Sequence, residues 1–301
     1  MIKKLVFLII ILTGILITGC NSNDDQAFEE PFDGSLEHVH GMGYAGNDGG
    51  LYFASHTGLK IYRDGEWFET TKNFNDYMGF SPVDQGFYTS GHPGKDSDLP
   101  NPLGIQRSFD GGETLKSIDF VGETDFHEMA VGYTSHDIFL KNHKENSKLG
   151  VGFYISSDNG ESWEGIVASG IEGEVFALAI HPSDSDYLAA ATTTGIYLSN
   201  DRGKNFKMIT EGVQGTAVYF NEENLIYASY DSTPSLAKFN IKTGEQVTIN
   251  LPELTEDGPV NIAQNQQNNQ ELAIYTTKGN AYISEDSTET WLQILENGKV
   301  K

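Results

Sequence analysis

The chain has 301 residues, of which 43 are acidic and only 19 basic, so its formal net charge is −24. A surface this negative repels nucleic acid and anionic lipid headgroups, which both need a basic face, whereas it favours cations. We therefore expect no nucleic-acid partner. The single cysteine excludes an internal disulfide framework, so a core of its own must stabilise the fold, and a chain of this length can supply one.

Residues 1–19 are predicted to be the signal peptide of an exported lipoprotein. Two lysines precede the apolar run 5–16, which is shorter than the roughly 20 residues that a membrane-spanning helix needs. The run is followed by Ile-Thr-Gly-Cys at 17–20, which resembles a bacterial lipobox. This resemblance implies that Cys20 carries a diacylglyceryl group, which would anchor the mature chain to the cell membrane outside the cytoplasm. Residues 20–35 are polar and acidic without periodicity, so we interpret them as a flexible tether.

A short motif recurs along the rest of the chain. Residues 156–163 read Ser-x-Asp-x-Gly-x-x-Trp, and variants begin at Ser108, Ser199 and Ser284, the last without the glycine. The Ser and Asp side chains can bond backbone amides of a turn between two strands, and the aromatic residue can pack between neighbouring sheets. We therefore interpret the repeated positions as structural. These positions are Asp110, Asp158, Asp201 and Asp286, with Trp163 and Trp291.

The spacing of this motif predicts a β-propeller. Ser156 lies 48 residues after Ser108, Ser199 lies 43 residues after Ser156, and Ser284 lies two further steps along. Each period has room for four short strands, a to d, which is typical of a propeller blade. We predict an all-β fold with six blades of four antiparallel strands over residues 36–296. A seventh blade would have to lie in the tether.

Histidines gather at one predicted end of three adjacent blades. In an antiparallel blade, the start of strand a and the b–c loop lie on the same face, with strand a nearest the axis. Five of the eight histidines map to that face, together with a methionine and two carboxylates. The candidate face comprises His38, His40, His56, Met78, His92, Asp125, His127 and Glu128. The other three histidines, His136, His143 and His181, are given no role.

Three interpretations of the candidate face remain open. Imidazoles beside carboxylates suit a transition metal, copper or zinc, and Met78 favours copper. The same groups could provide general acid and base catalysis on a polar ligand, or they could merely cap turns. The cofactor and the ligand are otherwise unknown.

The repeated motif resembles the Asp-box (BNR) repeat superfamily, which includes sialidases and Vps10/sortilin domains. Residues 38–41, 78–80, 91–93 and 125–127 more closely resemble a family of bacterial secreted lipoproteins that are labelled glycosyl hydrolase-like. The resemblance implies the propeller fold and leaves two functions open: a binding lipoprotein, or a hydrolase that uses the histidine face. Sialidases clamp a carboxylate with three arginines. The only arginines here, Arg63, Arg107 and Arg202, lie at Asp-box turns, so we exclude sialidase activity.

Overall fold

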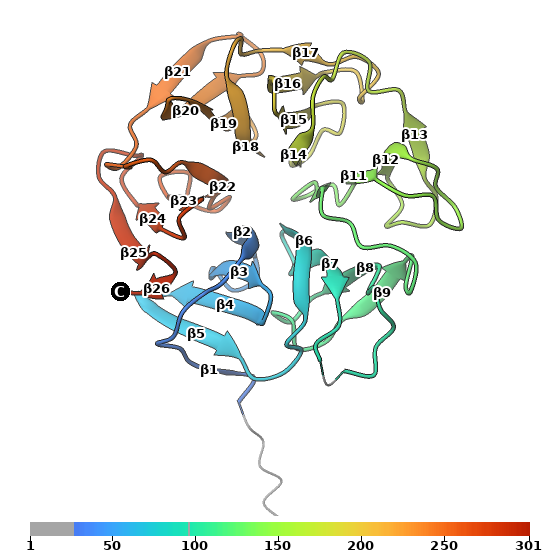
Figure 1. Ribbon diagram of the computed structural model, residues 1–301, viewed down its shortest axis with the longest axis vertical. Helices are drawn as coiled ribbons and strands as arrows, with labels where there is room; N and C mark the ends of the chain where they lie inside the picture. Colours follow the sequence, from blue (N-terminus) through green and yellow to red (C-terminus); the bar gives the residue numbers. More distant parts are fainter. Residues whose placement is uncertain (1–26, 96) are drawn as a thin grey trace, which may run out of the picture.

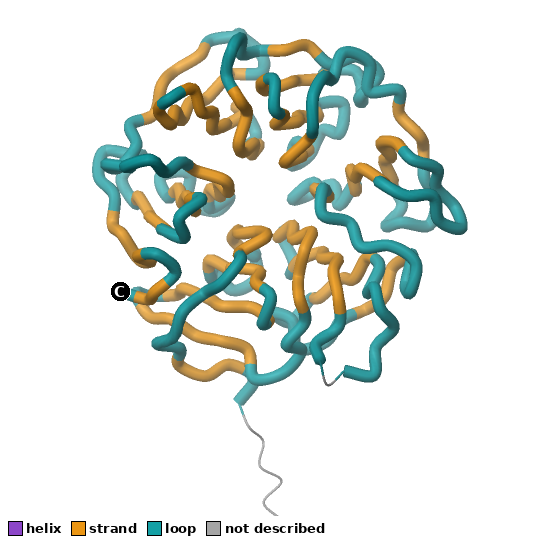
Figure 2. Tube along the Cα trace, in the orientation of Figure 1, coloured by secondary structure: helices purple, strands orange, loops and turns teal. Residues whose placement is uncertain are grey.

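The computed structural model describes residues 27–95 and 97–301, which form a ring of six sheets around a central axis (Figure 1). Every regular segment in this part is a strand (Figure 2). The six-bladed, all-β prediction is therefore confirmed. The predicted signal peptide and Cys20 lie outside the described residues.

Each blade is built from consecutive strands, which pair antiparallel with their neighbours in chain order. Blade one contains β2 (Val39–Tyr44), β3 (Leu51–Ser55), β4 (Gly58–Arg63) and β5 (Glu66–Thr70). Blade two contains β6 (Asp76–Pro82), β7 (Phe87–His92), β8 (Ile105–Ser108) and β9 (Lys116–Asp119). Blade three contains β10 (Met129–Val131), β11 (Ile138–Asn142), β12 (Gly152–Ser156) and β13 (Glu164–Ile166).

The second half of the ring repeats this order. Blade four contains β14 (Val175–Ile180), β15 (Leu188–Thr192), β16 (Gly195–Ser199) and β17 (Lys207–Met208). Blade five contains β18 (Gln214–Phe220), β19 (Asn224–Asp231), β20 (Thr233–Asn240) and β21 (Gln246–Ile249). Blade six contains β22 (Pro259–Gln264), β23 (Leu272–Thr276), β24 (Ala281–Ser284) and β25 (Leu292–Glu296), and β26 (Lys299–Val300) extends it.

Apolar side chains hold each blade against the next. One buried cluster fills each boundary between neighbouring blades in the described part of the chain. Between blades one and two, for example, the fully buried Tyr52 and Ile61 pack with Tyr77 and Phe87. Because both faces of each sheet are covered in this way, the strands are nearly continuous apolar runs, as in Leu188–Thr192.

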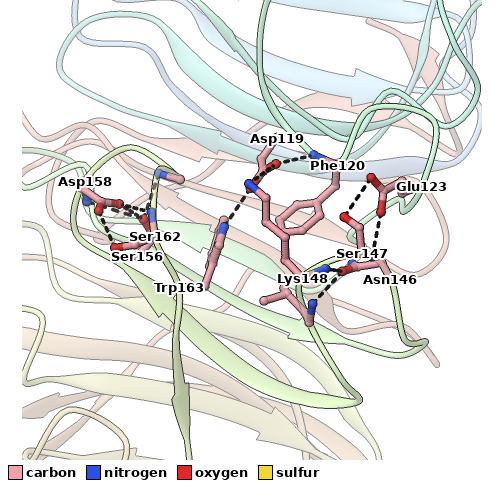
Figure 3. A network of polar contacts seen from close by, with 12 residues as sticks. Asp119, Phe120, Glu123, Asn146, Ser147, Lys148, Ser156, Asp158, Ser162 and Trp163 are labelled. Atoms are coloured by element: carbon pink, nitrogen blue, oxygen red, sulfur yellow. Dashed lines mark hydrogen bonds and ion pairs between the residues drawn. The ribbon is translucent and has the colours of Figure 1, made fainter.

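The Asp-box turns have the bonds that the motif suggests. The Asp158 carboxylate accepts from the Ser156 hydroxyl at 2.8 Å and from the Ser162 amide at 2.9 Å, and the Gly160 amide donates to Ser156 Oγ at 2.8 Å (Figure 3). Trp163 joins the apolar cluster between blades two and three, and its indole N–H donates to Asp119 at 3.0 Å. The turn thus ties its own blade to the preceding one.

The Asp-box of blade six keeps this geometry without its glycine. The Thr288 amide donates to Ser284 Oγ at 2.9 Å, as the glycine amide does in the other turns. To do so, Ser287 and Thr288 adopt φ values of 61° and 73°, which a β-branched residue such as threonine rarely takes. Trp291 still packs beside the cluster between blades five and six and donates to the Asn250 carbonyl at 2.9 Å.

The Asp-box carboxylates should make the fold sensitive to acid. Hydrogen bonds from the Ser162, Asn205 and Thr290 side chains, respectively, lower the pKa of Asp158, Asp201 and Asp286 from 3.8 to about 2. A carboxyl whose pKa is depressed by folding stabilises the fold above pH 3.8, and that stabilisation is lost as the pH falls toward 2. We expect the Tm to fall between pH 4 and pH 2, and to fall less in Asp158→Asn/Asp201→Asn, as followed by circular dichroism. An equally steep fall in that variant and in the exposed-site control Asp33→Asn would contradict this assignment.

The described part of the predicted tether packs against blade one. Residues 29–31 form β1 and pair with β5, and the Arg63 guanidinium bonds Glu29 at 2.8 Å. The ring is closed close by, where the Leu36 amide donates to the Gly298 carbonyl at 2.7 Å and Ser35 forms a bridge with Lys299. The propeller therefore extends beyond 36–296 at both ends, and residues 27–35 are part of it instead of a free linker.

Candidate functional site

The innermost strands of all six blades surround a channel along the ring axis. It contains a cavity of about 460 Å³, which lies within the usual range for small-molecule sites. His40, His127 and Glu128 line the cavity from blades one and three, whereas Phe176, Thr216 and Val260 line it from blades four, five and six. The channel therefore has an ionisable wall and a mainly apolar wall.

β-bulges place most of these side chains in the channel. The innermost strands of blades one, four, five and six each shift register across one residue, and these residues are His40, Phe176, Thr216 and Val260. In blade two the shift spans Met78 and Gly79. A bulged residue has no cross-strand partner and its side chain is re-aimed, so the bulges determine which side chains line the channel wall.

Four of the predicted histidines form a chain of contacts at the mouth of the channel. The rings of His38 and His56 stack with centroids 4.7 Å apart, and those of His56 and His40 stack at the same distance. The His127 ring lies edge-on to His40 at 6.5 Å. β2 begins at Val39, so His38 lies before the strand, and its imidazole meets that of His40 through His56.

Asp76 is the carboxylate at the centre of this group. Its Oδ1 atom lies 3.9 Å from His40 Nε2 and 3.8 Å from His56 Nε2. Both distances exceed those of a hydrogen bond. The Asp76 Oδ1 atom is nevertheless buried and has no hydrogen-bond partner. A buried carboxylate oxygen without a partner is costly, and here it faces two imidazole nitrogens that could share an ion with it.

The histidine beside Asp76 is suited to bind a cation. Burial lowers the pKa of the His40 imidazole, the neighbouring His56 lowers it further, and Asp76 opposes the shift. His40 is therefore neutral at pH 7, and a neutral imidazole has a free lone pair for a metal.

A second carboxylate, Asp125, lies between His127 and His92, the fifth predicted histidine. Its Oδ2 atom lies 3.2 Å from His127 Nδ1 and 3.5 Å from His92 Nε2. The opposite ring nitrogen of His92 lies 2.7 Å from the Asn101 side-chain oxygen. Because an amide oxygen only accepts, Nδ1 of His92 carries the proton. Asn101 thus orients the His92 ring, whose other nitrogen faces Asp125.

Two residues of the site were not among the sequence candidates. Asp76 occupies the position in blade two that Asp125 has in blade three, one residue before a buried aromatic (Tyr77 or Phe126). His143 lies 2.5 Å from Glu128 Oε2 through its Nε2 atom. In blades one to three, a histidine lies at or directly after the end of the second strand. These histidines are His56 after β3, His92 at the end of β7 and His143 after β11. Aligning these three strand ends would have identified His143.

Of the eight predicted residues, only His40, His127 and Glu128 line the cavity; His38, His56, His92, Asp125 and Met78 do not. Met78 lies in the bulge of β6 with a half-buried side chain. The three arginines lie away from the channel. Arg63 bonds Glu29, Arg107 lies over the Tyr88 ring at 4.7 Å and Arg202 bonds Ser185 at 2.8 Å. None of the three lines the cavity.

The chain is similar in sequence to one family model. A model described as sortilin, neurotensin receptor 3 (Sortilin-Vps10), matches residues 104–243, which run from blade two into blade five. No curated protein matches the chain. In the described part of the chain, no helix is long and apolar enough to cross a membrane.

Solved structures share the fold at low sequence identity. The GH74 enzyme of Niastella koreensis has a TM-score of 0.58 and 15% identity, over 90% of this chain and 47% of that protein, so this chain spans about half its length. YCF48 from Cyanidioschyzon merolae has a TM-score of 0.53 and 14% identity, over 91% and 90%. The extracellular domain of BT4673 from B. thetaiotaomicron has a TM-score of 0.55 and 13% identity, over 89% and 35%.

Proposed function

We propose that this protein is an extracytoplasmic lipoprotein that binds a transition-metal ion at the mouth of its channel, through His40, His56 and Asp76. The observation that carries the proposal is the buried, unpartnered Asp76 Oδ1 atom, which lies 3.8 to 3.9 Å from two imidazole nitrogens. An ion between the three atoms would satisfy the oxygen and use both lone pairs.

The distances suit a small divalent ion. Metal–ligand bonds of 2.0 to 2.2 Å place neighbouring tetrahedral ligands about 3.4 Å apart, so each imidazole nitrogen must move about half an ångström closer to Asp76 Oδ1. The His40 and His56 rings are stacked with an interplanar angle of 17°. They must therefore splay for both lone pairs to point at one ion. Rotation about the terminal torsion of histidine is soft enough for this.

The donor set narrows the identity of the metal. Two imidazoles and a carboxylate suit zinc, copper(II), nickel and cobalt(II), and disfavour calcium and magnesium, which prefer oxygen ligands. Met78 would favour copper only if its sulfur reached the site. The three proposed ligands thus do not favour copper over zinc.

Two further observations support the proposed location. The apolar leader and the lipobox-like Cys20 are the features of an exported, lipid-anchored chain, and one structural neighbour is an extracellular domain. The alternative, glycosyl hydrolase activity, rests on the fold alone, because the GH74 neighbour shares 15% identity.

Metal content tests the proposal directly. The purified chain is incubated with zinc or copper sulfate, dialysed and measured by elemental analysis. We expect about one ion per chain from a single three-ligand site, and a loss of most of it in His40→Ala. His136→Ala removes an imidazole outside the proposed site and should load normally. Equal metal content in the parent chain and in His40→Ala would overturn the proposal.

A further inference from the structure

We propose that the channel takes a small organic ligand, which binds the metal through a neutral nitrogen or singly charged oxygen donor and packs an apolar body against blades four and six. This inference rests on the proposed metal site and adds the chemistry of a second ligand. It follows from three features: an open metal position, apolar side chains on blades four and six, and an unpaired hydroxyl on blade five, which lies between those two blades.

The proposed metal site has room for a ligand from the channel. Asp76, His40 and His56 supply three donors, and a three-ligand site leaves the fourth position of a tetrahedral ion open. His40 also lines the cavity, so the open position can face it. Glu128 on the same wall adds negative charge, which disfavours a multiply charged anion as the donor.

The apolar side chains of the cavity lie on blades four and six. Blade four stands opposite blade one, which carries His40, whereas blade six is the neighbour of blade one (Figure 1). The bulged residues of blades four and six are Phe176 and Val260, and both line the cavity. Phe176 remains 42% exposed, although burying a phenyl ring would favour folding. An exposed ring in a channel wall offers a flat surface for an apolar ligand.

Thr216 adds a polar anchor on blade five. Its hydroxyl oxygen is buried and has no hydrogen-bond partner, and the residue lines the same cavity. A ligand group with one donor or acceptor would satisfy it. The cavity of about 460 Å³ accepts a molecule of ordinary drug-like size. The ligand class is thus a compact amphipathic molecule with a metal-binding head and a ring or branched aliphatic body.

Two probes of different size separate these contributions. The chain is loaded with Co²⁺, whose visible absorption reports entry of a new nitrogen donor, and is titrated with imidazole or with 4-phenylimidazole. Both probes offer the metal the same donor, and only the second can reach Phe176. We expect 4-phenylimidazole to bind about tenfold more tightly, and Phe176→Ala to remove that advantage without changing the affinity for imidazole. Phe109→Ala removes a comparably exposed ring outside the cavity and should change neither affinity.

The outcomes distinguish this inference from the metal proposal. If the chain takes up no cobalt, the proposed metal site is wrong, and the proposal of a metal-bound ligand is wrong as well. If cobalt binds but the two probes have equal affinity, or if Phe176→Ala weakens both equally, the metal site stands and the ligand proposal is overturned. Tight binding of 4-phenylimidazole to metal-free protein would also overturn it, because the metal would then not hold the head of the ligand.

Discussion

Replacing Asp76 with asparagine is expected to weaken metal binding about a hundredfold while leaving the metal-free fold at least as stable. The substitution removes the negative charge that an ion between two imidazoles needs, and it keeps the shape of the side chain. In the metal-free chain the Asp76 Oδ1 atom is buried without a partner, so a neutral amide costs less to bury there than a carboxylate. Isothermal titration with zinc measures the affinity, and thermal unfolding in a chelator measures the stability.

Asp257 provides the matched contrast. It is 3% exposed, and its carboxylate accepts from the Thr276 hydroxyl, the Asn280 amide and the backbone amides of Gly258 and Lys278. Asp257→Asn turns one acceptor into a donor that faces other donors, so we expect it to destabilise the fold by about 2 kcal/mol without affecting zinc binding. If Asp76→Asn instead lowered the Tm as much as Asp257→Asn, Asp76 would be a structural carboxylate and the metal site would lose its main support.

The fold was predictable because the information that sets it is local and repeated. Each Asp-box fixes its own turn with hydrogen bonds between residues that are four positions apart or fewer, as Asp158 does with Ser156 and Ser162. Its aromatic residue packs against the neighbouring sheet, as Trp163 of blade three does against blade two. The repeat also fixes which loops share a face, because strands alternate in direction. This rule predicts that His40, His56 and His127 lie on one face, and their rings contact one another there.

The centre of the site was harder to predict because it depends on contacts between blades. Asp76 opens β6 of blade two, yet its partners His40 and His56 belong to blade one. A lone aspartate at the start of a strand is common, and nothing local indicates that its Oδ1 atom is buried. The bulges at His40 and Phe176 were equally hidden, since a one-residue shift depends on how neighbouring strands twist.

The tether illustrates a second reason why sequence alone is insufficient, since its pairing depends on a strand elsewhere in the fold. Residues 29–31 are polar and too short for a recognisable strand period. They pair with β5 because Arg63 and the open edge of blade one are available there. The open edge belongs to β5 of blade one, so the sequence of residues 29–31 alone does not reveal it.

The second large effect concerns the fold and comes from replacing Gly86 with alanine. Gly86 lies in the turn before β7 with φ of +81°, and a Cβ there would lie within 1.9 Å of the Ser108 carbonyl oxygen. That oxygen belongs to the backbone of the Asp-box turn in the same blade, so it cannot move without disturbing the turn. We expect Gly86→Ala to lower the free energy of unfolding by about 4 kcal/mol, since it adds a backbone clash to an unfavourable φ. Urea unfolding followed by tryptophan fluorescence measures it.

Gly65 isolates the contribution of the clash. Its φ of +84° is nearly the same as that of Gly86, but a Cβ at Gly65 would meet no atom within 4 Å. Gly65→Ala therefore suffers only the left-handed backbone penalty of about 1 kcal/mol. The difference between the two variants measures how rigidly the turn before β7 is held against the Asp-box of blade two. If both variants lost the same free energy of unfolding, the turn at Gly86 would be able to move, and the Asp-box that begins at Ser108 would not hold it rigidly.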